Sequence, residues 1–289
     1  MNVYAIITER ILKNIEAGVV PWRQTWANGL PKSAATGREY RGINLLMLGS
    51  AGFSSRYWMT FRQAERLGGH VLKGERASTV VYWKWRTAEE LEQRRQKTGQ
   101  NPAPCVPFTG SVFNLDQIAG VDRPQDDVIP SPHERLQRAD QLVEIMPDKP
   151  LVEHCLTNQP AYFPMADRIR LPHLSQFENA EAYYAVFFHE LIHASGHPKR
   201  LGRFPADERE SREEYSFEEL VAEFGSAFLG AFTGITRPQS EALHASYIEG
   251  WARVFRKDPR ILMRAASAAQ HAADYVRGKV IAEESLVAA

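Results

Sequence analysis

The chain has 289 residues, and its 35 Lys and Arg residues balance 35 Asp and Glu residues. Its longest uninterrupted apolar run, residues 182–188, is far shorter than the roughly 20 residues of a membrane-spanning helix. We therefore expect no membrane-spanning helix in this sequence, and the length is that of two domains, each able to bury a core.

The neutral total conceals an asymmetry between the two halves. Residues 1–125 contain 17 Lys and Arg against 10 Asp and Glu, whereas residues 126–289 contain 18 against 25. Such a difference suggests that the first half binds a polyanion. The only cysteines, Cys105 and Cys155, are far apart, so we expect reduced thiols rather than a disulfide framework.

The first half is expected to combine short helices with a β-hairpin. Apolar residues at helical spacing predict an amphipathic first helix ending at Gly18, and Glu9 and Arg10 within it argue against a signal peptide. The segments "NLLMLGSAG" and "TFRQAERLGG" are typical of short helices, the second with Thr60 as N-cap. Strands within "STVVYWKWR" and "FTGSVFNLDQIAGV" are expected to pair across an exposed, charged hairpin tip or loop.

The second half is expected to be mainly helical. Residues 122–132 are rich in proline and acid where the charge changes sign, which predicts a linker with the domain boundary after residue 125. A helix at 135–145 and an edge strand in "AYFPMADRIRLP" precede further helices. These helical stretches are 180–195, 217–232 and 244–276. The predicted fold class is α+β, with domains at 1–125 and 126–289.

His189, Glu190 and His193 form the pattern H-E-x-x-H within the apolar helix "AEAYYAVFFHELIHAS". Two histidines four residues apart share one helical face, about 6 Å apart along the axis, so both imidazoles can bind one divalent ion. Glu190 can reach a water molecule at that ion and is the expected general base. The alternative is a pair of hydrogen-bonded histidines at the rim of a core helix. Ionisable groups on a buried helix need partners, which favours the metal.

The third ligand of a catalytic metal has to come from elsewhere, since such ions usually have three protein ligands. On one straight helix His197 would lie about 12 Å from His189, too far to share an ion unless the helix ends at Gly196. The metzincin pattern requires histidine where this chain has Lys199. His197 is therefore a weak candidate, and the metzincin arrangement is excluded.

A later helix, "YSFEELVAEFGSAFLGAF", offers acidic candidates. Glu219 and Glu223 share one face, so we expect Glu219 to bind the metal and Glu223 to lie behind it, against a ligand histidine. Glu218 is the main alternative to Glu219 as the third metal ligand. A capping role of Glu219 with Ser216 is the structural alternative.

Two features could serve peptide hydrolysis. The strand in "AYFPMADRIRLP" could line a cleft and bind an extended peptide by strand addition. Tyr247 or Tyr215 could provide a phenol that stabilises an oxyanion, and Tyr247 is the candidate we retain as catalytic.

Residues 22–86 are rich in interleaved aromatic and basic side chains. Unpaired bases stack on aromatic rings, at about 1–3 kcal/mol per base, while cations contact the phosphates. Duplex bases are already stacked, so single-stranded DNA is the predicted ligand, with steep salt dependence and little sequence preference. Several of these aromatics must also form the core. The residues expected to face DNA are Trp22, Arg23, Arg41, Asn44, Trp58 and Lys73.

Together these motifs resemble those of the ArdC-type antirestriction proteins of conjugative plasmids. In the first half the resemblance rests on "GVVPWRQTW", "TGREYRGIN" and "YWMTFRQAERLGGHVLKGERASTVVYW", a block also similar to the N-terminal region of TraC-type plasmid primases. In the second half it rests on "FFHELIHASGH", "YSFEELVAEFGSAFL" and "SYIEGWARVFRKDPR". The resemblance covers nearly the whole chain.

The resemblance implies a single-stranded-DNA-binding domain, a zincin-like metallopeptidase domain of gluzincin type, and protection of incoming plasmid DNA from host restriction. It also implies His189, His193 and Glu219 as ligands of one divalent ion, with zinc expected, and Glu190 as the catalytic residue. We therefore expect a cytoplasmic protein whose partners are single-stranded DNA and a host restriction protein as peptidase substrate.

Two alternatives to this interpretation stay open. The protein could coat DNA and protect it by occlusion, with a structural or inactive metal site. It could instead be a protease whose basic half docks an acidic protein.

Overall fold

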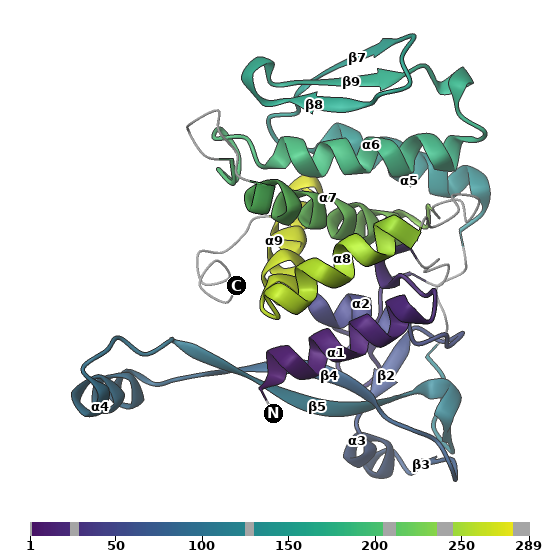
Figure 1. Cartoon of the computed structure of the whole chain (residues 1–289). Coiled ribbons are helices and arrows are strands. Elements are labelled where there is room, and N and C mark those ends of the chain that lie inside the picture. Colours follow the sequence, from purple (N-terminus) through teal and green to yellow (C-terminus); the bar gives the residue numbers. More distant parts are fainter. Residues whose placement is uncertain (1, 24–28, 125–129, 205–211, 236–244, 280–289) are drawn as a thin grey trace.

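The computed structural model describes residues 2–23, 29–124, 130–204, 212–235 and 245–279, without the side chains of 212–215 and 245–246. The fold is α+β with two domains, a first half built around β-strands and a mainly helical second half (Figure 1). The helices are α1 (Val3–Glu16), α2 (Ile43–Gly49), α3 (Phe61–Arg66), α4 (Ala88–Thr98), α5 (Pro132–Ile145), α6 (Ala180–Ser195), α7 (Arg212–Thr233), α8 (Ala245–Lys257) and α9 (Ile261–Val276). The strands are β1 (Lys32–Ser33), β2 (Tyr57–Met59), β3 (His70–Val71), β4 (Ser78–Trp85), β5 (Cys105–Asn114), β6 (Ile118–Ala119), β7 (Leu151–Cys155), β8 (Ala161–Phe163) and β9 (Arg168–Pro172).

The first half is organised by the long antiparallel hairpin of β4 and β5, as predicted. These strands extend a sheet with the order β1-β2-β5-β4, while β3 and β6 form a separate pair. The predicted N-cap of α3 is confirmed, because the Thr60 hydroxyl accepts a hydrogen bond from the backbone of Gln63 at 3.3 Å. The hairpin tip is more ordered than expected. It contains α4, which Thr87 caps at its start and Gly99 ends in a left-handed conformation.

The second half contains more strands than predicted. The segment "AYFPMADRIRLP" forms two antiparallel strands, β8 and β9, because Pro164 begins a 3-10 turn that reverses the chain. The unpredicted strand β7 pairs with β9 in parallel, which gives the order β7-β9-β8. This sheet covers one side of α6, and α7 lies on the other (Figure 1). Burial between two layers explains why α6 is apolar on most of its faces.

Helices α6 and α7 pack unusually closely at Gly225. A Cβ atom at this position would lie 2.7 to 2.9 Å from three side-chain atoms of Ile192, which is closer than real contacts allow. Glycine therefore lets the α7 backbone lie directly on α6. The distance between the two helices sets how far the acidic residues of α7 lie from the histidines of α6.

The largest hydrophobic core runs through both halves of the chain. It begins at Ile7 in α1, includes Trp22 and Leu46 of the first half, and continues to Val276 in α9. Smaller clusters around Trp58 and Met59 lie within the first half. The expectation that each half buries its own core is therefore wrong for α1 and α2, whose apolar faces pack on α8 and α9. The boundary predicted after residue 125 falls next to residues 125–129, outside the described residues, and stays a prediction.

The two cysteines lie in different sheets, Cys105 in β5 and Cys155 in β7, as free thiols. Among the described helices, none is both long and apolar enough to cross a membrane.

Gly225→Ala tests the close packing of α6 and α7. The steric overlap should cost up to about 3 kcal/mol, and the roughly 1 kcal/mol that alanine gains over glycine in a helix offsets only part of it. Gly250→Ala is the matched control, because a Cβ atom there has no heavy atom within 4 Å among the described residues. Urea unfolding should place Gly225→Ala below both the wild type and Gly250→Ala, and equal stability of the two variants would contradict the packing.

Candidate metal centre

His189 and His193 of α6 meet Glu219 of α7 in one half-buried group. The Nε2 atoms of the two imidazoles are 3.1 Å apart. The Glu219 carboxylate lies 3.7 Å from His189 Nε2 and 3.6 Å from His193 Nε2. Ligand atoms bound tetrahedrally at 2.0–2.1 Å from one ion are about 3.3 Å apart. Two imidazole nitrogens and one carboxylate oxygen at these separations fit a divalent ion such as zinc.

Glu218 and Arg203 hold His193 from behind. His193 Nδ1 lies 3.4 Å from Glu218, which leaves Nε2 as the nitrogen that faces Glu219. Arg203 makes two hydrogen bonds to the Glu218 carboxylate, at 2.8 and 3.1 Å, and a third to the carbonyl of Ile192. Burial alone would raise the pKa of Glu218, but hydrogen bonds from His193 and Arg203 outweigh it and lower that pKa. The charged carboxylate fixes the tautomer and orientation of the imidazole.

Glu190 is buried on α6 beside this group. Burial is the main cause that raises the pKa of its carboxyl group, and the charge of Glu219 adds to it. His193 and the nearby backbone N–H of Tyr162 act in the opposite direction and lower this pKa. A carboxyl group whose pKa is raised above its usual range is suited to accept and return a proton near neutral pH.

The other residues considered for metal binding, His197, Glu218 and Glu223, lie outside the group of three. His197 lies beyond the end of α6, outside the group of three, and its Nδ1 accepts a hydrogen bond from the backbone of Lys199. The carboxylate that contacts Nδ1 of His193 is that of Glu218, the predicted alternative to Glu219 as a metal ligand. Glu218 precedes Glu219 directly, so both reach α6, whereas Glu223 lies one turn further along α7. The expected contact of Glu223 with a ligand histidine stays a prediction.

Glu223 instead joins the two halves of the chain. Its carboxylate lies 3.4 Å from the hydroxyl of Tyr247 and 3.7 Å from the guanidinium of Arg23. The indole of Trp22 donates a hydrogen bond to the same hydroxyl at 3.2 Å. Burial, followed by the charge of Glu223, raises the pKa of Tyr247, so the phenol stays protonated. In this arrangement Tyr247 donates to Glu223, and its catalytic role stays a prediction. The side chain of Tyr215 lies outside the described residues.

Four of the six predicted DNA-facing residues are used within the fold. Trp22 is 2 % exposed and packs 5.0 Å from Phe224, and Trp58 is 1 % exposed. Their prediction is wrong, because a tryptophan is the largest apolar side chain and the core encloses it. Arg23 is directed toward Glu223 and Tyr247, which corrects its prediction.

The other three predicted DNA contacts differ from one another. Asn44 makes hydrogen bonds of 2.8 and 2.7 Å to both backbone groups of Val81, so its amide holds α2 on β4 and its prediction is also wrong. Arg41 is half exposed although it pairs with Asp274 at 2.5 Å, and Lys73 is exposed. For these two residues DNA contact stays a prediction.

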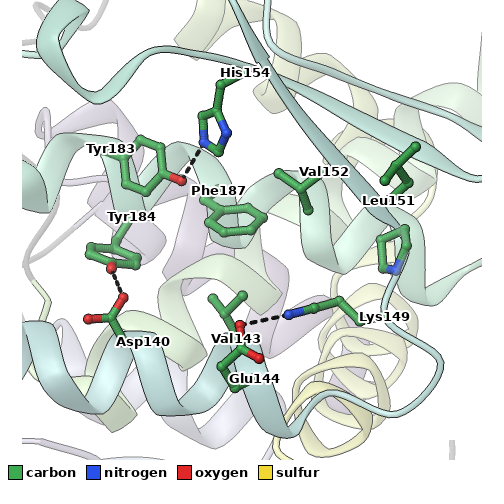
Figure 2. A pocket seen from close by; sticks show the side chains of 11 residues that line it. Asp140, Val143, Glu144, Lys149, Leu151, Val152, His154, Tyr183, Tyr184 and Phe187 are labelled. Carbon is green, nitrogen blue, oxygen red and sulfur yellow. Dashed lines mark hydrogen bonds and ion pairs between the residues drawn. The ribbon is translucent and has the colours of Figure 1, made fainter.

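A separate pocket of about 660 Å³ lies between α5, β7 and α6 (Figure 2). Tyr184 and Phe187 line it from the side of α6 opposite His189 and His193. Tyr184 donates a hydrogen bond to Asp140, as Figure 2 shows. The pocket is therefore distinct from the metal centre.

Comparisons with known proteins agree with this arrangement. Residues 1–113 match the N-terminal domain of anti-restriction factor ArdC, and residues 138–268 match a zincin-like metallopeptidase domain. A crystal structure of the antirestriction ArdC protein from plasmid R388, described as Mn(II)-bound, is 33% identical with a TM-score of 0.75, over 96% of this chain and 97% of that one. The chain belongs to the ArdC family of antirestriction proteins.

The other relatives of this chain are proteins of different lengths. Two Escherichia coli proteins named DNA primase TraC are 33% and 32% identical over 93% and 94% of this chain. The chain spans only 26% and 20% of their lengths. The uncharacterized protein y4eC of Sinorhizobium fredii (strain NBRC 101917 / NGR234) is 33% identical, over 96% of this chain and 92% of its own length.

Arg203 is a site residue that sequence reasoning missed. It follows the motif helix in a loop and lies 15 residues before its partner Glu218, so no helical or strand period connects them. The adjacent acidic residues Glu218 and Glu219 were the available signal, because a carboxylate that becomes buried requires a cation nearby.

Glu218→Ala tests the support of His193. Loss of the carboxylate behind a ligand histidine should weaken binding of a divalent ion about 10- to 100-fold. Competition with a chromophoric chelator measures this, and His197→Ala is the control that should bind like the wild type. If both variants keep wild-type affinity, Glu218 does not orient the ligand.

Proposed function

We propose that this protein binds single-stranded DNA without sequence preference and hydrolyses a protein substrate with a metal-dependent peptidase site. By both means it would protect incoming plasmid DNA from host restriction, in the cytoplasm of the recipient cell. The observation that carries the proposal is the meeting of His189, His193 and Glu219, with the buried Glu190 on the same helix.

His189, His193 and Glu219 would hold the ion, which we propose to be zinc. Their mixed nitrogen and oxygen donor set is that of gluzincin sites, and the Mn(II)-bound relative supports a divalent ion. A bound ion would supply the Lewis acid chemistry that peptide hydrolysis needs. Glu218, held by Arg203, would keep the donor nitrogen of His193 directed toward the ion.

Glu190 would act as the general base. It would take a proton from the attacking water and return it to the leaving amine. The backbone N–H of Tyr162 in β8 lies near the Glu190 carboxyl group and lowers its pKa, so the edge of the three-stranded sheet lies at the site. An extended peptide could align along that edge, which supports a protein substrate, and a host restriction protein is the proposed target.

The nucleic-acid part of the proposal rests on charge and on relatives. Residues 1–125 carry the excess of Lys and Arg, and the related proteins named DNA primase TraC act on DNA by their name. A single strand suits this half better than a duplex, because unpaired bases can stack on exposed aromatic rings.

One observation favours the alternative in which the protein coats DNA and its metal site is structural. Trp22 and Glu223 engage the hydroxyl of Tyr247, so that the phenol proton points to Glu223 rather than to a substrate. Protection would then arise from occlusion of the DNA.

Glu190→Gln separates the two possibilities. The variant should keep its metal, measured by elemental analysis beside Glu219→Ala, because glutamine has nearly the same size. Hydrolysis should fall by about 100-fold or more, since removal of a general base costs on this order. New protein N-termini, identified by mass spectrometry in a host lysate, report the cleavage.

The same variant is then tested for plasmid transfer into a restricting host. Loss of protection with metal retained supports the peptidase. Full protection by Glu190→Gln supports occlusion, and metal loss equal to that of Glu219→Ala would remove the assigned role of Glu190.

Fluorescence anisotropy of the full chain with labelled oligonucleotides tests the DNA proposal. We expect tighter binding to a single strand than to a duplex. The logarithm of the association constant should fall linearly with the logarithm of the salt concentration, with a slope of about −0.7 for each phosphate contacted. Tighter binding to duplex, or salt-independent binding, would contradict it.

A further inference from the structure

The hairpin of β4 and β5 forms an arm that extends away from the body and carries α4 at its tip (Figure 1). Near the body the arm is part of the core, where Val80 and Val112 are buried with Trp58. Further out the same strand faces are open to solvent, with Tyr82 36% and Phe108 47% exposed. Aromatic rings at such positions do not serve the core.

The exposed rings of Tyr82 and Phe108 are held in fixed positions on the arm. The two residues are cross-strand partners, and their rings stack with centroids 5.6 Å apart and planes inclined by 29°. The Tyr82 ring also lies over Gly110, where a Cβ atom would be 2.4 Å from Cε2 of the ring. The partly buried Tyr40 lies beside the Tyr82 side chain. A ring held by Phe108 and by the Gly110 backbone loses little freedom when a ligand stacks on it.

Cations accompany this aromatic pair. Lys84 lies two residues beyond Tyr82, on the same strand face, and is exposed, although it is 3.7 Å from Glu90. Residues 82–108 contain five Lys and Arg against three Glu. Exposed cations of α4 are Arg94, Arg95 and Lys97. The arm thus combines partly exposed aromatic rings with an excess of positive charge, as nucleic-acid surfaces do.

We propose that Tyr82 and Phe108 form the platform on which bases of single-stranded DNA stack, with Lys84 and the cations of α4 at the phosphates. This rests on the proposed function and specifies its DNA surface. Single strands fit because duplex bases have no open face for stacking. The interleaved cations favour this ligand over an apolar protein partner or a second copy of the chain.

Gly110→Ala is the sharpest test, because it removes no aromatic ring and no charge but pushes Tyr82 from its position. We expect Gly110→Ala, Tyr82→Ala and Phe108→Ala each to lower the affinity for labelled oligothymidylate by about 5- to 150-fold, the loss of about one stacked base. Ser111→Ala is the matched control, on the neighbouring exposed position of the opposite strand face. Circular dichroism and metal content of each full-length variant verify folding.

The outcomes separate the platform from the proposed function. If the wild type does not bind the oligonucleotide, the proposed DNA binding fails with the platform. If the wild type binds and the three variants bind equally well, DNA binding stands and the platform is wrong. If the variants bind normally but lose self-association in sedimentation experiments, the arm joins copies of the chain and the proposal is overturned.

Discussion

The close approach of α7 to α6 is the constraint on which the metal centre depends. Gly225 permits it, because any side chain there would overlap Ile192. The approach brings two adjacent carboxylates to the two nitrogens of one imidazole, Glu218 to Nδ1 and Glu219 to Nε2 of His193. A buried carboxylate such as Glu218 is tolerated only when a cation pairs with it, and Arg203 is that cation. Helix packing, charge balance and ligand orientation are therefore parts of one arrangement.

The same helix α7 connects the metal centre to the first half of the chain. Glu223, one turn after Glu219, contacts Arg23 and Tyr247, and Tyr247 contacts Trp22. The two halves also share one core, so they behave as one packed body in spite of their opposite charges. Aromatic residues near the start of the chain hold this junction, whereas Tyr82, Trp85 and Phe108 on the β4–β5 arm are exposed.

Features with a local physical cause were predictable. The bounds of α6 follow from its apolar pattern, and the convergence of His189 and His193 follows from helix geometry alone. The spacing of Glu219 and Glu223 placed both on one face of α7, and Glu219 lies beside the two histidines. The strand β7 was missed because it is only five residues long and its sequence, with Val152 beside Glu153, does not alternate between apolar and polar residues. The helix α4 was missed because all its residues are at least partly exposed, so no apolar stripe marks it.

What composition and spacing settled was the α+β class, the H-E-x-x-H helix and the difference in charge between the halves. The packed structure decided which tryptophans are buried, that Glu218 contacts Nδ1 of His193, and that Arg203 belongs to the site. The reason is physical. Hydrogen bonds along a helix join neighbours in sequence, whereas burial and ion pairing join residues that only the fold brings together. The sequence alone does not distinguish an aromatic residue in the core from one on an exposed arm.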